Sequence, residues 1–394
     1  MPIRYTTLLR LYPLFTGLLY FACSSSQPEQ KISKAQEKTN QSIPILVNGS
    51  KSFEWPEDLQ IEGITFLESA EKHMISFLRK LVVSPDGELL YIFDSRQQKM
   101  LVFDKSGKAV RVFDHQGEGP EEYLDMTELQ IDFEQGIFEL MDYQKIKKYD
   151  LNTFDYISTD NLGHLPRDKN FRNFVRIDDV LYLWTNLPPN QRVGQEDLGE
   201  HHLIKVEDGQ ISYFVEKQYG VINGQVFYPS PTKNEYNLPP VVGSTDLLTV
   251  TKDSVYVKYS LDYGNRGVPK FELENYWERQ DEIFNSNYYK PAQNIRETKN
   301  HLYFEFAGNR SEYHFTLLDK RTNSIQSIGK PSKRLNPAII YSDAEYFYAY
   351  LIPAFIVNYV ESGGDLSETT FFKDLDISKL EKYDNPVIVK FKLP

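Results

Sequence analysis

Residues 86–94 read DGELLYIFD, a polar turn followed at once by a short aromatic strand. Five later units of the same kind read QGIFELMD, DDVLYLWTN, KDSVYVKYS, KNHLYFEFA and AEYFYAYLI. The second turn residue falls at positions 87, 136, 179, 253, 300 and 345. A spacing of about 45 residues is typical of radial repeats of four-stranded blades. The sequence therefore predicts an all-β fold, a six-bladed β-propeller, with an insertion in the long gap between positions 179 and 253.

The sixth unit predicts that the two ends of the chain close the ring together. Residues 346–352 and 386–393 supply a second and a third strand, and no fourth strand follows them. We assign the missing outer strand to residues 63–67 (GITFL), because such pairing removes an exposed edge. Trimming either end should then destabilise the whole ring.

Three stretches are expected to interrupt the blades. Residues 187–199 and 219–243 are rich in Pro, Asn and Gly, and residues 361–385 are expected to carry a helix around 374–383. Long loops on a rigid scaffold are where binding residues tend to lie.

The N-terminus has the pattern of an export signal. Arg4 and Arg10 flank the start of a short apolar stretch that runs to Ala22, and the only cysteine of the chain, Cys23, follows it. This placement resembles a bacterial lipobox, with Tyr20 where Leu is usual, and the alternative is an ordinary signal peptide with an incidental cysteine. We predict a signal peptide over 1–22, a lipidated Cys23 with a flexible polar tether over 23–42, and the propeller over 43–394.

The charge balance limits the partners. The formal net charge is −12, and removal of residues 1–22 with their two arginines makes it −14. Nucleic-acid binding needs a basic footprint, which this chain lacks. The predicted membrane attachment is therefore through acyl chains at the outer membrane, on its periplasmic face or at the cell surface, and not through electrostatic adhesion.

Residues 115–123 (HQGEGPEEY) carry a family resemblance. They follow VFDKSGKAVRVF, which looks like the repeat of NHL-related propellers, and they resemble a signature of six-bladed β-propeller lipoproteins of Bacteroidetes-type bacteria. Residues 259–264 with 268–269, and residues 385–393, resemble other parts of that family, and Glu121 stands where the family typically has glycine. The resemblance covers about residues 60–394 and implies an exported, lipid-anchored propeller without implying an activity. From the residues alone, Gly117, Gly119 and Pro120 predict a corner between two blades, with a ligand-contacting loop as the alternative.

Catalytic signatures are scarce in the sequence. It contains no nucleophile elbow, no HExxH helix, no P-loop and no dinucleotide fingerprint. Neighbouring His201 and His202 would point to opposite sides of a strand, which makes joint metal binding awkward. We therefore predict no catalytic residue, no cofactor and no metal site.

One geometric argument selects candidate ligand-binding residues. In a propeller the loops between second and third strands open on one side of the ring, where arginine, amide and aromatic side chains can hold a sugar or a peptide. Solvated turn residues are the plain alternative. The candidates are Arg96, Gln97, Tyr143, Tyr263, Arg266, Asn309 and Arg310.

These observations favour a non-enzymatic module that binds a glycan, a peptide or a protein, with a role as an accessory to an outer-membrane uptake complex as one form of this reading. A hydrolase or lyase acting on peptide or polysaccharide at the mouth of the central channel is the alternative. A purely structural subunit of the envelope is a third reading.

Overall fold

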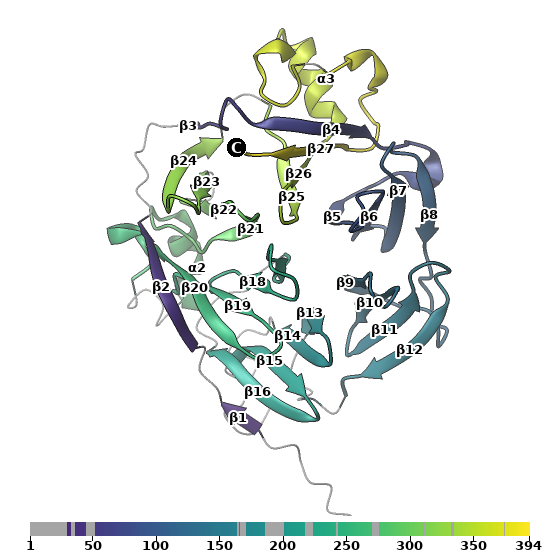
Figure 1. Cartoon of the computed structure of the whole chain (residues 1–394), viewed down its shortest axis with the longest axis vertical. Helices are drawn as coiled ribbons and strands as arrows, with labels where there is room; N and C mark the ends of the chain where they lie inside the picture. Colours follow the sequence, from purple (N-terminus) through teal and green to yellow (C-terminus); the bar gives the residue numbers. More distant parts are fainter. Residues whose placement is uncertain are drawn as a thin grey trace, which may run out of the picture.

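A computed structural model describes residues 30–32, 36–44, 52–163, 165, 171–185, 201–216, 224–241, 243–269, 276–309, 312–331, 335–373 and 375–394. Six small sheets stand around a central axis as the blades of a propeller (Figure 1). The prediction of an all-β, six-bladed β-propeller is confirmed.

Each blade runs from an inner strand at the axis to an outer strand at the rim. Blade 1 consists of β5 (Leu78–Val83), β6 (Leu89–Asp94), β7 (Lys99–Asp104) and β8 (Ala109–Phe113). Blade 2 consists of β9 (Met126–Asp132), β10 (Ile137–Asp142), β11 (Lys145–Asp150) and β12 (Tyr156–Asn161). Blade 3 consists of β13 (Phe171–Ile177), β14 (Val180–Thr185), β15 (His201–Glu207) and β16 (Gln210–Glu216). Blade 4 consists of β17 (Tyr228–Pro229), β18 (Tyr236–Leu238), β19 (Asp246–Val250) and β20 (Val255–Asp262). Blade 5 consists of β21 (Gln293–Glu297), β22 (His301–Ala307), β23 (Tyr313–Asp319) and β24 (Ser324–Pro331). Blade 6 consists of β25 (Ala338–Ser342), β26 (Phe347–Leu351), β27 (Val387–Lys392) and β4 (Gln60–Phe66).

The ring closes as the sequence predicts. Strand β4 comes from the N-terminal side and pairs antiparallel with β27, from Gln60 opposite Lys392 to Phe66 opposite Val387. The N-terminal side of the chain therefore donates the outer strand of blade 6, so that β27 is paired and not an exposed edge.

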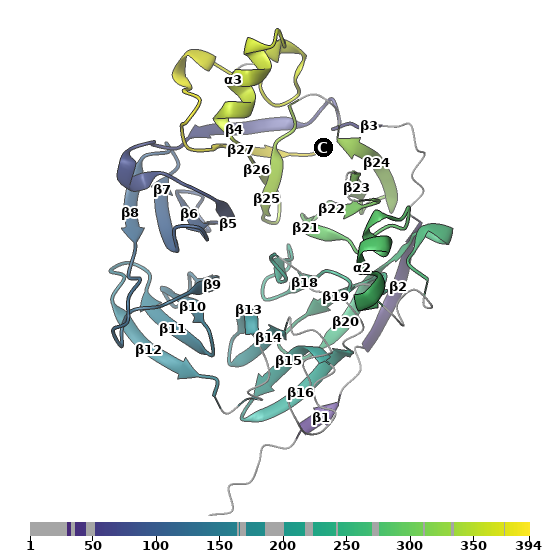
Figure 2. The ribbon, with the colours of Figure 1, turned by 180° about the vertical axis from the view of Figure 1, so that it is seen from behind.

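The N-terminal segment also adds strands to three other blades. Strands β1 (Gln30–Ile32), β2 (Gln36–Pro44) and β3 (Ser52–Phe53) pair parallel with the outer strands of blades 3, 4 and 5 in turn. They lie along the rim in both views (Figure 2). Residues 30–32 and 36–42 are thus paired strands and not part of a free tether, which corrects the predicted tether over 23–42.

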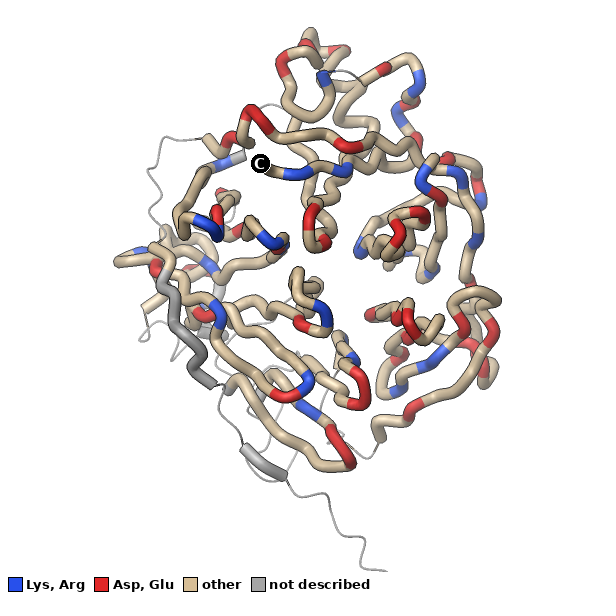
Figure 3. Tube along the Cα trace, in the orientation of Figure 1, with Lys and Arg blue, Asp and Glu red and all other residues tan. Residues whose placement is uncertain are grey.

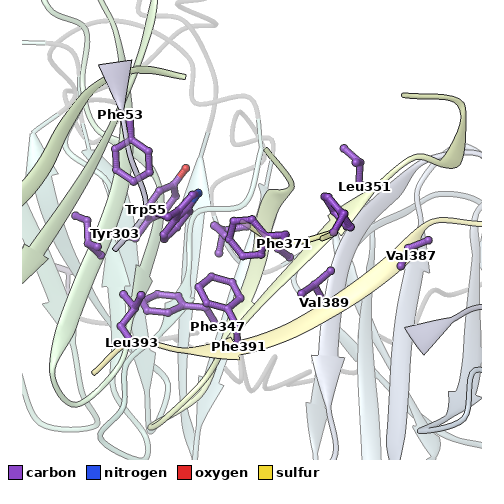
Figure 4. Close-up of a cluster of buried hydrophobic side chains, with 14 of the residues drawn as sticks. Phe53, Trp55, Tyr303, Phe347, Leu351, Phe371, Val387, Val389, Phe391 and Leu393 are labelled. Carbon is purple, nitrogen blue, oxygen red and sulfur yellow. The ribbon is translucent and has the colours of Figure 1, made fainter. Parts of the chain in front are cut away.

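A cluster of aromatic side chains locks the N-terminal segment between blades 5 and 6. Trp55 stacks on Tyr303 at 5.7 Å between ring centroids and meets Phe371 and Phe391 edge-on at 5.5 and 5.4 Å. Phe53 packs on Trp55 at 5.0 Å (Figure 4). Rings in these arrangements attract each other beyond the area they bury, so the closure rests on packing as well as on strand pairing.

Blade 4 departs from the predicted repeat. The turn at Lys252 and Asp253 is expected to join the first two strands, but it joins the third and fourth, β19 and β20. The reason is that β17 and β18 are only two and three residues long and carry no aromatic run. The stretch 219–243, expected to be an insertion, contains these inner strands. The 74-residue gap therefore reflects a shift of phase as well as added residues.

The connection between β26 and β27 is helical, but not where the sequence predicts it. The helix α3 spans Pro353–Glu361, and the region around 374–383 carries only a 3-10 turn at Ile377–Lys379. Proline at the first helical position has the backbone angle that a helix start needs. A second helix, α2 (Tyr276–Asn285), lies between blades 4 and 5. The insertion predicted at 187–199 lies outside the described residues.

The segment 115–123 is a corner between blades 1 and 2, as its glycines and proline predict. The buried Tyr123 donates its hydroxyl to the carbonyl oxygen of Gln98 in blade 1. In blade 2, Tyr149 donates to the carbonyl oxygen of Glu121 at 2.7 Å. Gly117 does not have positive φ, and a Cβ there would meet the carboxylate of the exposed Glu122, which would have to move aside.

Candidate binding site on the loop face

The two sides of the ring differ in which connections they carry. We call the side with the turns between first and second strands the turn face. We call the side with the links between second and third strands, and between successive blades, the loop face. Turn-face hairpins are polar and include Asp86-Gly87, Gln135-Gly136, Asp178-Asp179 and Lys299-Asn300.

Large exposed apolar side chains gather on the loop face. Within the described part of the chain nine such side chains are exposed, and two of them, Val110 and Ile157, lie on the outer strands β8 and β12. The other seven belong to loop-face connections or begin a strand there: Phe77, Leu124, Tyr143, Tyr313, Ile352, Phe355 and Tyr383. These side chains are spread over several blades, so a binding site on this face has to be located from its pockets.

The inner strands at the axis are occupied with joining the blades. Lys80 of β5 donates to Glu128 of β9 at 2.7 Å, and Arg296 of β21 donates to Gln225, just before β17, at 3.1 Å. Further bonds of this kind run from Gln130 to the carbonyl oxygen of Arg176 and from Asn294 to that of Ile339. These polar groups therefore hold neighbouring blades together at the axis.

A pocket of about 560 Å³ lies on the loop face between blades 2 and 3. Blade 2 supplies the connection before β9, the turn between β10 and β11 and the end of β12, and blade 3 supplies the start of β13. The lining residues are Leu124, Asp125, Thr127, Asp142, Tyr143, Gln144, Lys145, Asn161, Phe171 and Arg172. Three of these ten residues are apolar or aromatic and seven are polar or charged, so the pocket is more polar than the mainly apolar sites usual for small ligands.

Tyr143 is the unusual residue of this pocket. It belongs to a two-residue turn between the paired Asp142 and Lys145, and its φ is +53°. Such turns normally place glycine, asparagine or aspartate at positive φ, because a Cβ there costs roughly 1–2 kcal/mol. The ring is nevertheless 59% exposed, so this strain is not offset by burial of the ring.

The charged groups around Tyr143 balance one another. Asp142 is buried and accepts the backbone amide of Asp125 at 3.1 Å, which fixes the pocket wall. Lys145 and Arg172 are exposed, and neither has an ion pair among the described residues. The pocket thus offers two carboxylates and two unpaired cations, with amides from Gln144 and Asn161.

The other predicted ligand residues have mixed positions. Arg96 is exposed on the loop face of blade 1, but Gln97 donates to Met74, Ser76 and Asp94 and so holds its own loop. Tyr263 is buried and packs on Tyr289 and Phe306, which makes it a core residue instead of a ligand contact.

Arg266 and Asn309 lie on the loop face near the junction of blades 4 and 5. Arg266 donates to the hydroxyl of Tyr289 at 2.6 Å and lies 5.1 Å from the centre of that ring. Asn309 lines a smaller pocket of about 170 Å³ with Lys290. Burial lowers the pKa of Lys290 to about 8, while its ammonium donates to backbone carbonyls such as that of Gly308. Arg310 lies outside the described residues.

A third pocket, of about 490 Å³, opens beside α3 on the same face. Its lining is mainly apolar and includes Leu335, Tyr350, Ile352, Phe355 and Tyr359. All three pockets therefore open on the loop face. Sequence reasoning identified Tyr143 but missed Arg172 and Asn161, because strand spacing alone does not bring neighbouring blades together.

Metal and membrane features are limited in the described part of the chain. No three His, Cys, Asp or Glu side chains gather there in a metal-binding arrangement. The buried His202 stacks on Trp184 at 5.0 Å. None of the described helices has the length and apolar character needed to cross a bilayer.

Comparison with known families agrees with this architecture. Residues 33–347 match the model of the family described as 6-bladed beta-propeller (DUF5128). The chain belongs to this family. The propeller is similar to the crystal structure of a Bacteroides fragilis protein classed as exported, at 16% identity and a TM-score of 0.71, over 90% of this chain and 100% of that one.

The propeller is also similar to a Bacteroides vulgatus protein of the DUF4221 family, at 14% identity and a TM-score of 0.52, over 85% of this chain and 98% of that one. At these identities the similarity shows the fold alone. None of the curated proteins is similar to the chain in sequence.

Proposed function

We propose that this propeller is an exported protein of the outer membrane, lipid-anchored through Cys23, that binds a saccharide in the pocket between blades 2 and 3. The observation that supports binding at this place is Tyr143, an exposed aromatic ring held at positive φ over a pocket of about 560 Å³. Backbone strain without a gain in packing is found chiefly at functional sites.

The chemistry of the pocket favours a neutral saccharide over a charged ligand. A sugar hydroxyl both donates and accepts hydrogen bonds, so it can pair with Asp142, with Asn161 and with Arg172 alike. An anion would face the carboxylates of Asp125 and Asp142, and a cation would face Lys145 and Arg172. The aromatic face of Tyr143 matches the apolar C–H face of a pyranose ring.

The binding test uses a panel of neutral oligosaccharides, namely gluco-, xylo-, manno- and galacto-oligomers. Saturation-transfer NMR measures whether each of them binds. We expect one class to bind and Tyr143→Ala to weaken it at least about tenfold, the loss of an aromatic contact of about 1.4 kcal/mol. The matched control is Tyr313→Ala, which removes another exposed tyrosine of the loop face outside this pocket. Binding that survives Tyr143→Ala, or binding of charged polymers alone, would contradict the proposal.

The anchor is tested separately. Metabolic labelling with a radioactive fatty acid should mark the wild-type protein and not Cys23→Ser, and only the wild type should sediment with membranes. An unlabelled wild-type protein would remove the anchor from the proposal and leave the binding site standing.

A further inference from the structure

The chain meets the ring at one defined place on the rim. Strand β1 begins at Gln30, which lies beside Ile211 on the outer strand of blade 3. Ile211 comes two residues after Gly209, in the turn between β15 and β16. The propeller is therefore connected to everything before residue 30 through the edge of blade 3.

The length of the preceding chain limits how far this edge can lie from the anchor. Seven peptide steps separate Cys23 from Gln30, and a fully extended chain of that length reaches at most about 25 Å. A tether over 23–42 would reach nearly three times as far. Pairing of β1 and β2 with the rim removes most of that freedom.

From this geometry, and resting on the proposed lipid at Cys23, we infer that the bilayer lies beside the rim of blade 3 and that blade 6 with α3 points away from it. Blade 6 is three blades from blade 3 in the ring of six. Strand β1 and helix α3 lie at opposite ends of the longest axis of the molecule in both views (Figures 1 and 2).

Charge near blade 3 gives no competing reason for another orientation. Lysines there are paired with carboxylates: Lys205 with Glu207 at 2.8 Å and Lys252 with Asp179 at 2.7 Å. Among the described residues, positive and negative side chains are interspersed around the ring (Figure 3). The unpaired Arg172 of blade 3 and Lys145 of blade 2 lie in the loop-face pocket with Asp125 and Asp142, which offset their charge. Attraction to anionic lipid is therefore small, and the short tether decides which side faces the membrane.

This orientation places the apolar surface at α3 away from the bilayer. Ile352, Phe355 and Tyr383 are exposed by 43%, 57% and 82%, and apolar side chains of this kind can insert into a bilayer or contact a protein. At the end of the molecule farthest from the anchor they cannot reach the bilayer that holds Cys23.

The test uses the full lipidated protein in liposomes that carry an energy-acceptor dye on the lipid headgroup. Because Cys23 is the only cysteine and is consumed by the lipid, one added cysteine is the single labelling site. Donor dyes are placed at Gln210→Cys in blade 3 and at Tyr383→Cys beside α3, both exposed positions. We expect a strong loss of donor fluorescence at 210 and little or none at 383.

A longer tether sharpens the experiment. Insertion of about 24 Gly/Ser residues after Ser26 adds roughly 25–30 Å of mean reach and should restore donor fluorescence at 210. Equal loss at both positions, greater loss at 383, or no effect of the longer tether would overturn the orientation. If the wild-type protein carries no lipid, both the anchor and the orientation fail, which the fatty-acid label reports independently.

Discussion

On the turn face, positive φ falls mostly on glycine, aspartate and asparagine, such as Gly87 at +74° and Asp178 at +54°, and Phe154, at +67° on the same face, is buried. On the loop face, Tyr143 at +53° is exposed. The turn face carries short polar hairpins, and the loop face carries the exposed aromatic side chains of the described residues and the three pockets described above. The backbone strain at Phe154 is accompanied by burial of its ring, whereas the strain at Tyr143 is not, and Tyr143 borders a pocket. This difference predicts that changes on the turn face alter stability, and that changes on the loop face alter binding.

The largest effect is expected at Glu297, beside the turn between β21 and β22. Its buried carboxylate accepts Lys258 at 2.8 Å, Lys320 at 2.6 Å and Asn237 at 2.7 Å. Burial alone would raise the pKa of this carboxyl, but the two ammonium groups hold it below its usual range. Glu297→Ala leaves both lysines without their partner and should lower the free energy of unfolding by about 3–5 kcal/mol.

Urea unfolding followed by tryptophan fluorescence measures this loss. The matched control is Glu88→Ala, which removes an exposed carboxylate paired with the exposed Lys105 and should cost less than about 1 kcal/mol. Saccharide binding, measured at urea concentrations below the unfolding transition, should be unchanged in both variants. If Glu297→Ala abolished binding while stability stayed constant, the division between the two faces would be wrong.

A second effect is expected at Gly107, in the turn between β7 and β8. Its φ is +88°, and a Cβ there would collide with the backbone carbonyl of Phe66 in the closing strand β4. Gly107→Ala should cost about 3 kcal/mol, because the strain of a left-handed residue is added to displacement of the strand. Gly87→Ala is the control: φ is +74° but the space around it is open, so about 1 kcal/mol is expected.

Thermal unfolding of the two variants decides whether ring closure is involved. Equal losses in Gly107→Ala and Gly87→Ala would mean that β4 yields freely to the added methyl group. In that case the closure would contribute less to stability than its aromatic packing suggests.

The sequence predicted the parts of this molecule that depend on local pattern. Strand β6 follows the polar turn at 86–87 within the stretch 86–94, as predicted, since an apolar and aromatic run that begins at a polar turn encodes a strand locally. The donated strand β4 was predicted at 63–67 because blade 6 lacks an outer strand, and it spans Gln60–Phe66.

Other parts could not be predicted because their cause is not local. Strands β1 and β2 read QKI and QEKTNQSIP, without apolar alternation, and they are held by backbone pairing at the rim. Blade 4 shifted phase because its inner strands are too short to show a period. The signal for the pocket was present in the sequence, as the two-residue turn Tyr143-Gln144 contains no glycine, but Arg172 joins it only through the packing of neighbouring blades.

A smaller effect tests the loop face from the side of stability. Tyr143→Gly removes the Cβ from a left-handed residue, which relieves roughly 1–2 kcal/mol of strain. Part of this gain is cancelled, because glycine loses more conformational entropy on folding than tyrosine does. We expect the variant to be up to about 1 kcal/mol more stable than the wild type and to lose saccharide binding. Differential scanning calorimetry and the NMR assay measure the two outcomes on one sample. A variant that is clearly less stable would mean that Tyr143 is a structural residue and not a binding residue.

The smallest effect is expected at Asp319, which ends β23 next to a turn. Hydrogen bonds from Arg321, at 2.8 and 3.0 Å, lower the pKa of this carboxyl from its usual 3.8 to about 2. A carboxyl whose pKa is lower in the folded state stabilises the protein above pH 4, and the contribution is lost as the pH falls from about 4 to 2. Because the Arg321 side chain is 48% exposed, solvent weakens the pair, and we expect only about 1 kcal/mol.

Urea unfolding of the wild type and Asp319→Asn at pH 6 and pH 3 measures this contribution. The difference between them should be about 1 kcal/mol at pH 6 and clearly smaller at pH 3, since the wild-type carboxyl loses its advantage as it takes up a proton. Asp253→Asn, at an exposed turn residue, should show no difference at either pH. An Asp319→Asn loss that is the same at both values would assign the effect to turn geometry and not to charge. The ion pair between Asp319 and Arg321 would then add nothing to stability, and the hydrogen bonds of the turn alone would stabilise it.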